Sequence, residues 1–209
     1  MKSYEYGDSK ANTVLIQMVD EHSQMESELA AIKAHTREPF RLIAVEVGHW
    51  NTGLSPWEAP PVFGSDAFGS GAEQTLTEVL KLTADRQKTY ILGGYSLAGL
   101  FALWAAYQTD VFAGVAAASP SVWFPGFVDY MKGHRVRSSI VYLSLGDQEE
   151  KARNPVLATV GEYIREAERL LRGQGVDCTL KWNQGNHFRD ADLRTARAFA
   201  WVMERQNRL

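Results

Sequence analysis

The chain has 209 residues, of which 45% are hydrophobic, and carries a formal net charge of −3. This length suits one α/β domain spanning residues 1–209, and the apolar content is enough for a substantial core. The near-neutral charge and the lack of a basic block argue against a nucleic-acid partner. No run approaches the roughly 18 apolar residues that cross a bilayer, so we expect no membrane association.

Cysteine content and the first residues bear on the compartment. The single cysteine, Cys178, excludes an internal disulfide and is typical of a reducing environment. The N-terminal residues lack the apolar stretch of a secretory signal. We therefore expect a cytoplasmic globular protein, whose oligomeric state the sequence leaves open.

Short β-rich runs alternate with helical patterns along the chain. In chain order, the periodicity predicts a strand at 14–19, a helix at 25–34, a strand at 42–47, a helix at 72–82, a strand at 89–94, a helix at 97–107, strands at 112–118 and 139–145, a helix at 155–171, a strand at 178–182 and a helix at 190–205. This alternation predicts a compact, mostly parallel sheet with helices on both faces. In such sheets the active site lies at the carboxyl ends of the strands.

A serine directly follows the 89–94 strand, in the segment Gly93-Gly94-Tyr95-Ser96-Leu97-Ala98-Gly99-Leu100. A serine on a sharp strand-to-helix turn, with small residues two places to either side, is typical of a nucleophile elbow. The turn exposes the hydroxyl, and the helix N-terminus favours developing negative charge. The alternative is a serine that only caps a buried helix. The strand, turn and helix around Ser96 favour the nucleophile.

Two histidines lie beyond Ser96, and their surroundings differ. His134 lies in a polar stretch that resembles a solvated loop. His187 lies between the last predicted strand and the last helix, where the general base of a Ser-His-acid hydrolase belongs. We therefore predict that His187 takes the serine proton and returns it to the leaving group.

The acid that orients the histidine should follow the penultimate strand. The loop after that strand carries three carboxylates, Asp147, Glu149 and Glu150. Residue types and chain order leave all three open.

Four segments together resemble a known family. They are Gly94–Leu100, Ala118-Ser119-Pro120-Ser121-Val122-Trp123, the loop 146–150, and Gly185-Asn186-His187-Phe188. The chain resembles the esterase branch of the α/β hydrolases that includes esterase D-like enzymes and enterobactin-type trilactone esterases. Ala98 departs from this family by standing where glycine is usual, and Gly53 stands where relatives often carry an acid.

The resemblance implies an α/β-hydrolase fold, and we see no inserted lid domain. Relatives place the acid three residues after the loop glycine, which selects Glu149, with Asp147 and Glu150 as alternatives. The family also implies an oxyanion hole made by the backbone N–H of Leu97 and one from the loop at Asp20 or Glu21.

Aromatic and histidine residues gather in loops expected near this site. Aromatic rings can grip an acyl or aryl group, although most single aromatics fill cores. The residues predicted to bind substrate are His22, His49, Trp50, Trp57, Tyr95, Trp123 and Phe188. No metal-ligand spacing is present, so we expect neither a metal nor another cofactor.

These observations predict a serine esterase that cleaves a small-molecule carboxylic ester through an acyl-enzyme. An acyltransferase with the same three residues is one alternative. A binding protein that keeps the fold without turnover is the other, because a fold does not determine a function.

Overall fold

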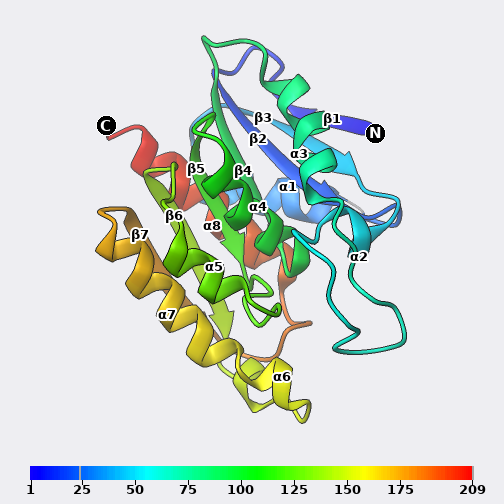
Figure 1. The fold of residues 1–209 in the computed structure, drawn as a ribbon. Helices are drawn as coiled ribbons and strands as arrows, with labels where there is room; N and C mark the ends of the chain where they lie inside the picture. Colours follow the sequence, from blue (N-terminus) through cyan, green and yellow to red (C-terminus); the bar gives the residue numbers. More distant parts are fainter. Residues whose placement is uncertain (24, 209) are drawn as a thin grey trace.

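The computed structural model describes residues 1–23 and 25–208, and seven strands within them form one sheet (Figure 1). The spatial order of the strands is β1-β3-β2-β4-β5-β6-β7. The first strand pairs antiparallel with β3, and all other neighbours are parallel. The strands are β1 (Ser3–Gly7), β2 (Thr13–Val19), β3 (Phe40–Glu46), β4 (Thr89–Tyr95), β5 (Phe112–Ala118), β6 (Ile140–Gly146) and β7 (Asp177–Asn183).

Helices cover both faces of this sheet (Figure 1). One face carries α1 and α8, which also contact each other, and the other carries α3, α4, α5 and α7. The α-helices are α1 (Glu26–His35), α2 (Trp50–Gly53), α3 (Ala72–Leu80), α4 (Leu97–Gln108), α5 (Phe127–Gly133), α6 (Pro155–Ala158), α7 (Val160–Gly173) and α8 (Ala191–Gln206). Two 3₁₀ turns, η1 (Lys81–Thr83) and η2 (Glu149–Lys151), complete the described elements.

All six strands predicted from the sequence are present, with ends displaced by at most two residues. The edge strand β1 was not predicted, because its sequence Ser-Tyr-Glu-Tyr-Gly is polar and largely exposed. The short helix α5 was also missed. The single helix expected at 155–171 is wrong: Asn154 caps the short helix α6, and α7 starts separately at Val160.

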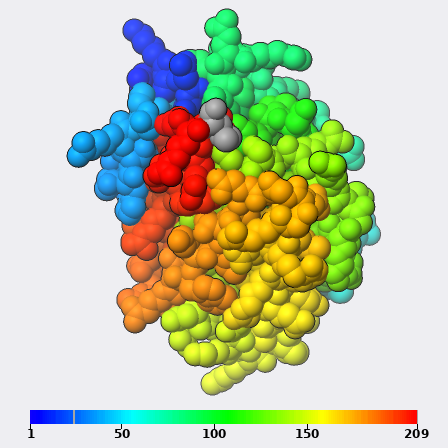
Figure 2. Space-filling view, turned by 90° about the vertical axis from the view of Figure 1, so that its left-hand side faces the viewer, coloured from blue at the N-terminus to red at the C-terminus, as the bar shows by residue number. Residues whose placement is uncertain are grey.

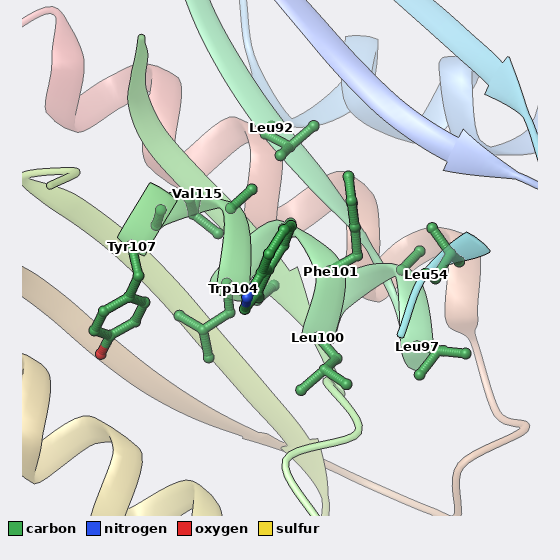
Figure 3. Packing of buried hydrophobic residues seen from close by; sticks show 14 of the residues in the cluster. Leu54, Leu92, Leu97, Leu100, Phe101, Trp104, Tyr107 and Val115 are labelled. Carbon is green, nitrogen blue, oxygen red and sulfur yellow. The ribbon is translucent and has the colours of Figure 1, made fainter. Parts of the chain in front are cut away.

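The helix α4 is buried along nearly its whole length. Figure 3 shows its apolar side chains on all sides, with Leu92 of β4 and Val115 of β5 beside the face that meets the sheet. A helix that is apolar all round requires burial on every side. This helix begins immediately after Ser96, so the predicted nucleophile is attached to a helix that is packed on all sides in the core.

The last helix, α8, lies across the other face. Figure 2 shows its end, coloured red, at the surface between the light-blue segment after α1 and the orange surface of the α7–β7 region. None of the helices in the described residues is long and apolar enough to cross a membrane.

The strand order reverses beside β2. From β2 the chain moves to β3 on one side, and it then returns to β4 on the other side. In open parallel sheets such a reversal opens a crevice at the carboxyl ends of the two strands. Here these ends carry Asp20 after β2 and Ser96 after β4.

Candidate active site

Ser96 has a backbone conformation that few residues other than glycine adopt, with φ 57° and ψ −120°. The end of β5 holds this conformation, since Ser96 N–H donates to Ala118 O (3.1 Å) and Ser121 N–H donates to Ser96 O (3.0 Å). The hydroxyl is therefore presented at the carboxyl edge of the sheet. This geometry is the sharp strand–turn–helix that the sequence predicts.

Gly94 has a steric reason to lack a side chain. A Cβ added there would lie 2.6 Å from Cβ of Ala98 and 3.0 Å from its carbonyl carbon. The turn brings the strand end and the first turn of α4 too close for two side chains. Ala98 fits at this position because Gly94 leaves the space.

Three side chains from distant parts of the chain form a continuous hydrogen-bonded line. Nε2 of His187 lies 2.9 Å from Oγ of Ser96, and Nδ1 lies 2.6 Å from Oε2 of Glu149. The His187 side chain is 29% exposed, whereas that of Glu149 is 5% exposed. The arrangement can pass a proton from the serine to the imidazole, beside a buried carboxylate that would stabilise the imidazolium.

The second oxygen of Glu149 is held by three donors. Its Oε1 accepts hydrogen bonds from the Gly146 N–H (2.7 Å), the Ser119 hydroxyl (3.0 Å) and the Arg194 guanidinium (3.0 Å). These bonds fix the carboxylate so that Oε2 faces the imidazole. Glu149 begins the turn η2, which directs its side chain inward.

The other two candidate acids contact different groups. Asp147 accepts a hydrogen bond from Gly185 N–H (2.9 Å), and this bond is the main reason that its pKa lies below the ordinary value. It thereby ties down the loop that carries His187. Glu150 pairs with Arg165 on α7 (2.9 Å). Among the three candidates, the imidazole contacts Glu149.

Arg194 was not recognised from the sequence. It lies on α8, its side chain is 1% exposed, and besides Glu149 it donates to Tyr95 Oη (3.1 Å) and to the carbonyls of Gln184 (3.2 Å) and Asn186 (3.0 Å). One guanidinium thus joins the acid, the elbow and the His187 loop. The sequence pattern places Arg194 at an ordinary exposed position of an amphipathic helix, so no local signal identifies its role.

A cavity of about 270 Å³ adjoins Ser96 and is lined by the end of β2, the following loop, the start of α1, Trp50 and the start of α8. Asp20, predicted for the oxyanion hole, lines this cavity, and Glu21 does not. Leu97 is the first residue of α4, where a backbone N–H has no partner within the helix. Both N–H groups proposed for the oxyanion hole therefore belong to segments that border Ser96.

The predicted substrate-binding residues fall into two groups. Tyr95 and Trp50 line the cavity beside Ser96. Tyr95 also donates its hydroxyl to His187 O (2.7 Å), and burial raises its pKa above the ordinary value.

The second group does not line the cavity. Trp57 packs on Phe124 and Tyr130, and Trp123 is 7% exposed in an aromatic cluster with Phe63 and Phe68. His22 and His49 are exposed. Phe188 is 89% exposed and lies edge-on to His187. Among the described residues, no three His, Cys, Asp or Glu residues are grouped to hold a metal ion.

The comparisons with known proteins identify the fold. No protein-family model matches the sequence, and no curated protein matches it. An IroE-like serine hydrolase from Shewanella oneidensis superposes with a TM-score of 0.77 at 12% identity, over 97% of this chain and 75% of the other. The siderophore hydrolase EstA from Aspergillus nidulans superposes with a TM-score of 0.68 at 19% identity, over 96% and 85%. For Est1E from Butyrivibrio proteoclasticus the TM-score is 0.63 at 15% identity, over 99% and 94%.

The chain therefore has the α/β-hydrolase fold, and no large lid domain is present in the described residues. The resemblance to the esterase branch, predicted from four short segments, is confirmed at the level of the fold.

Proposed function

We propose that the protein is a serine esterase, with Ser96 as nucleophile, His187 as general base and acid, and Glu149 as the residue that orients the imidazole. The observation that carries the proposal is the unbroken line from Ser96 Oγ through His187 to Glu149, at 2.9 and 2.6 Å. Both distances lie within the range expected for a nucleophile, its base and the group that orients the base.

The reaction has two halves. Ser96 Oγ bonds to the carbonyl carbon while its proton moves to Nε2 of His187, and the C–O bond to the alcohol breaks as the alcohol takes that proton. Water then attacks the acyl-enzyme, giving its proton to His187, and Ser96 regains a proton as the carboxylic acid leaves. In the proposal, the N–H groups of Leu97 and of the Asp20–Glu21 loop stabilise the oxyanion in both halves.

Hydrolysis is favoured over acyl transfer by the exposure of the base. The His187 side chain is 29% exposed, so the base is in contact with bulk solvent, which can supply the attacking water. An acyltransferase must keep water away from the acyl-enzyme.

The cytoplasmic location stays a prediction based on the single cysteine.

A panel of p-nitrophenyl esters with increasing acyl length tests the proposal. The wild type should hydrolyse the short esters, and Ser96→Ala should lose about 10⁶-fold in kcat, as expected when a nucleophile that acts with its base is removed. A fluorophosphonate probe should label the wild type and leave Ser96→Ala unlabelled. A folded wild type that neither hydrolyses any ester nor reacts with the probe would instead be a binding protein on this fold.

A further inference from the structure

The cavity beside Ser96 contains a buried polar pair that the proposed reaction does not use. Gln17 on β2 is 6% exposed and Glu28 on α1 is 4% exposed, and both side chains line the cavity. Gln17 Nε2 donates to Glu28 Oε2 at 3.0 Å. Buried polar side chains normally have hydrogen-bond partners for all their polar atoms. A buried polar pair next to a nucleophile therefore needs an explanation if some of its atoms lack partners.

The protein supplies hydrogen-bond partners for only some of the polar atoms of this pair. Oε1 of Gln17 and Oε1 of Glu28 are both buried and have no hydrogen-bond partner among residues 1–23 and 25–208. A buried polar atom without a partner costs free energy comparable to a lost hydrogen bond. Two such atoms on residues that line the same cavity point to a ligand that supplies the missing partners.

The protonation of Glu28 determines which partner fits. Burial raises its pKa from the ordinary value of 4.5 to about 8; the hydrogen bond from Gln17 opposes this rise, and the Asp192 carboxylate on α8 adds to it. The group is therefore a neutral carboxylic acid at neutral pH. Since Oε2 accepts the Gln17 amide, the acid proton lies on Oε1 and is free to donate.

The pair then carries one unused donor, Glu28 Oε1–H, and one unused acceptor, Gln17 Oε1, on residues that line the cavity. If the amide of Gln17 is turned around, the pair still has one unused donor and one unused acceptor. The donor is then the amide N–H, and the acceptor is Glu28 Oε1. A hydroxyl group matches this pair, because it donates one hydrogen bond and accepts others. A carboxylate does not match this pair. Among the described residues, no Lys, Arg or His lines the cavity, whereas Asp20 and Asp192 do.

The remaining walls and the volume limit the size of the group. Met18, Val19, Met25 and Trp50 give the cavity apolar sides. Its volume of about 270 Å³ lies below the roughly 300 Å³ at which sites for drug-sized ligands begin. The cavity therefore suits a short aliphatic group with one polar substituent.

We infer that this cavity is a specificity subsite for a short, hydroxyl-bearing part of the ester substrate, which Gln17 and Glu28 hold by its hydroxyl beside Ser96. The inference rests on the proposed esterase function and names the substrate class for the same site. The hydroxyl can belong to the acyl or to the alcohol half of the ester, and the experiment distinguishes the two.

The test compares matched esters with and without the hydroxyl. Ethyl 3-hydroxybutyrate is compared with ethyl butyrate, and 3-hydroxypropyl butyrate with propyl butyrate, by titrating the released acid near neutral pH. Each kcat/KM is divided by the rate of hydroxide-catalysed hydrolysis of the same ester, which removes differences in intrinsic reactivity. One of the hydroxyl esters should be preferred by about tenfold or more, as expected for two hydrogen bonds to otherwise unpaired buried groups.

Three variants and a control assign the preference to the polar pair. Glu28→Leu should bring the ratio of hydroxyl to plain ester close to one, whereas Glu28→Gln, which keeps a donor and an acceptor, should retain most of it. Gln17→Leu should act like Glu28→Leu. Glu73→Leu makes the same chemical change at an exposed position of α3 and should leave the ratio as in the wild type.

The outcomes separate this inference from the proposed function. Wild type that hydrolyses the plain esters but prefers neither hydroxyl ester overturns the subsite and leaves the esterase intact. The subsite is also overturned, with the esterase intact, if Glu28→Leu keeps the wild-type ratio. A preference for ethyl 3-aminobutyrate over ethyl 3-hydroxybutyrate would overturn it as well, because it would identify an ammonium site. Absence of both hydrolysis and fluorophosphonate labelling overturns the two together.

Discussion

Arg194 donates a hydrogen bond of 3.0 Å to Oε1 of Glu149, and both side chains are almost fully buried. The same guanidinium donates to two carbonyls of the loop that carries His187. The guanidinium compensates the charge of this buried carboxylate, and its removal would leave that charge without a cation. Arg194 therefore positions the candidate base and acid relative to each other without touching Ser96.

Replacing Arg194 by Met should lower both stability and turnover. Removal of one partner of a buried ion pair costs about 3–5 kcal/mol of unfolding free energy, measurable by urea denaturation. In the protein that still folds, kcat should fall by roughly 100-fold with a smaller change in KM, because His187 is displaced from its place beside Ser96.

Two further variants, Arg194→Lys and Arg197→Met, distinguish a loss of activity through misplaced catalytic residues from one through lower stability. Lysine keeps the charge but cannot bond the carboxylate and both carbonyls together, so kcat should recover only in part. Arg197 is exposed on the same helix, and its replacement by Met should leave kcat unchanged. Full activity in Arg194→Met would contradict the positioning role.

The identity of the acid can be tested with three isosteric variants. Glu149→Gln should reduce kcat by about 10⁴-fold, as expected when the group that sets the histidine tautomer loses its charge. Glu150→Gln should change kcat little, since Glu150 pairs with Arg165. Asp147→Asn should have an intermediate effect through the loop bond to Gly185. A larger loss in Asp147→Asn than in Glu149→Gln would reverse the assignment.

Glu28 should make the protein less stable as the pH rises. Its pKa is raised from 4.5 to about 8, so between these values the unfolded chain releases a proton that the folded chain keeps. This contribution to stability is fully present below about pH 4.5, falls as the pH rises, and is lost once the pH passes about 8. A tenfold difference in proton affinity between the folded and unfolded chain corresponds to about 1.4 kcal/mol.

Glu28→Gln removes this titration. The difference in unfolding free energy between variant and wild type, measured with urea at a series of pH values, should grow in favour of the variant from about pH 5 to pH 8. A constant difference across that range would show that Glu28 is ionised in the folded protein.

The contact between Gly94 and Ala98 gives a paired prediction at the elbow. Gly94→Ala should destabilise the protein by about 1–3 kcal/mol, because its Cβ would lie 2.6 Å from that of Ala98. Ala98→Gly in the same chain should restore part of the loss, but not all of it, since the Ala98 carbonyl carbon at 3.0 Å stays in place. A double-mutant cycle with thermal unfolding measures the coupling, and strictly additive effects would argue against the steric contact.

The sequence by itself determined the alternation of strands and helices, and with it the parallel sheet and the position of Ser96 at its edge. These features are local, since period-two and period-3.6 patterns reflect which residues of one segment face the core. The small residues Gly94 and Ala98 are a local signal too, because a sharp turn has no room for larger side chains. The position of His187 after the last strand followed from chain order alone.

Only the tertiary structure decided which groups meet across the chain. Asp147, Glu149 and Glu150 are adjacent carboxylates of similar chemistry, and only the direction that η2 imposes brings Glu149 to His187. Arg194 and the Gln17–Glu28 pair read as ordinary polar positions, because their burial depends on elements packed against them from far along the chain. Trp123 and Phe188 likewise look alike in the sequence, yet one is buried and the other exposed. Contacts of this kind are set by the packing of whole helices on the sheet, and no segment encodes them on its own.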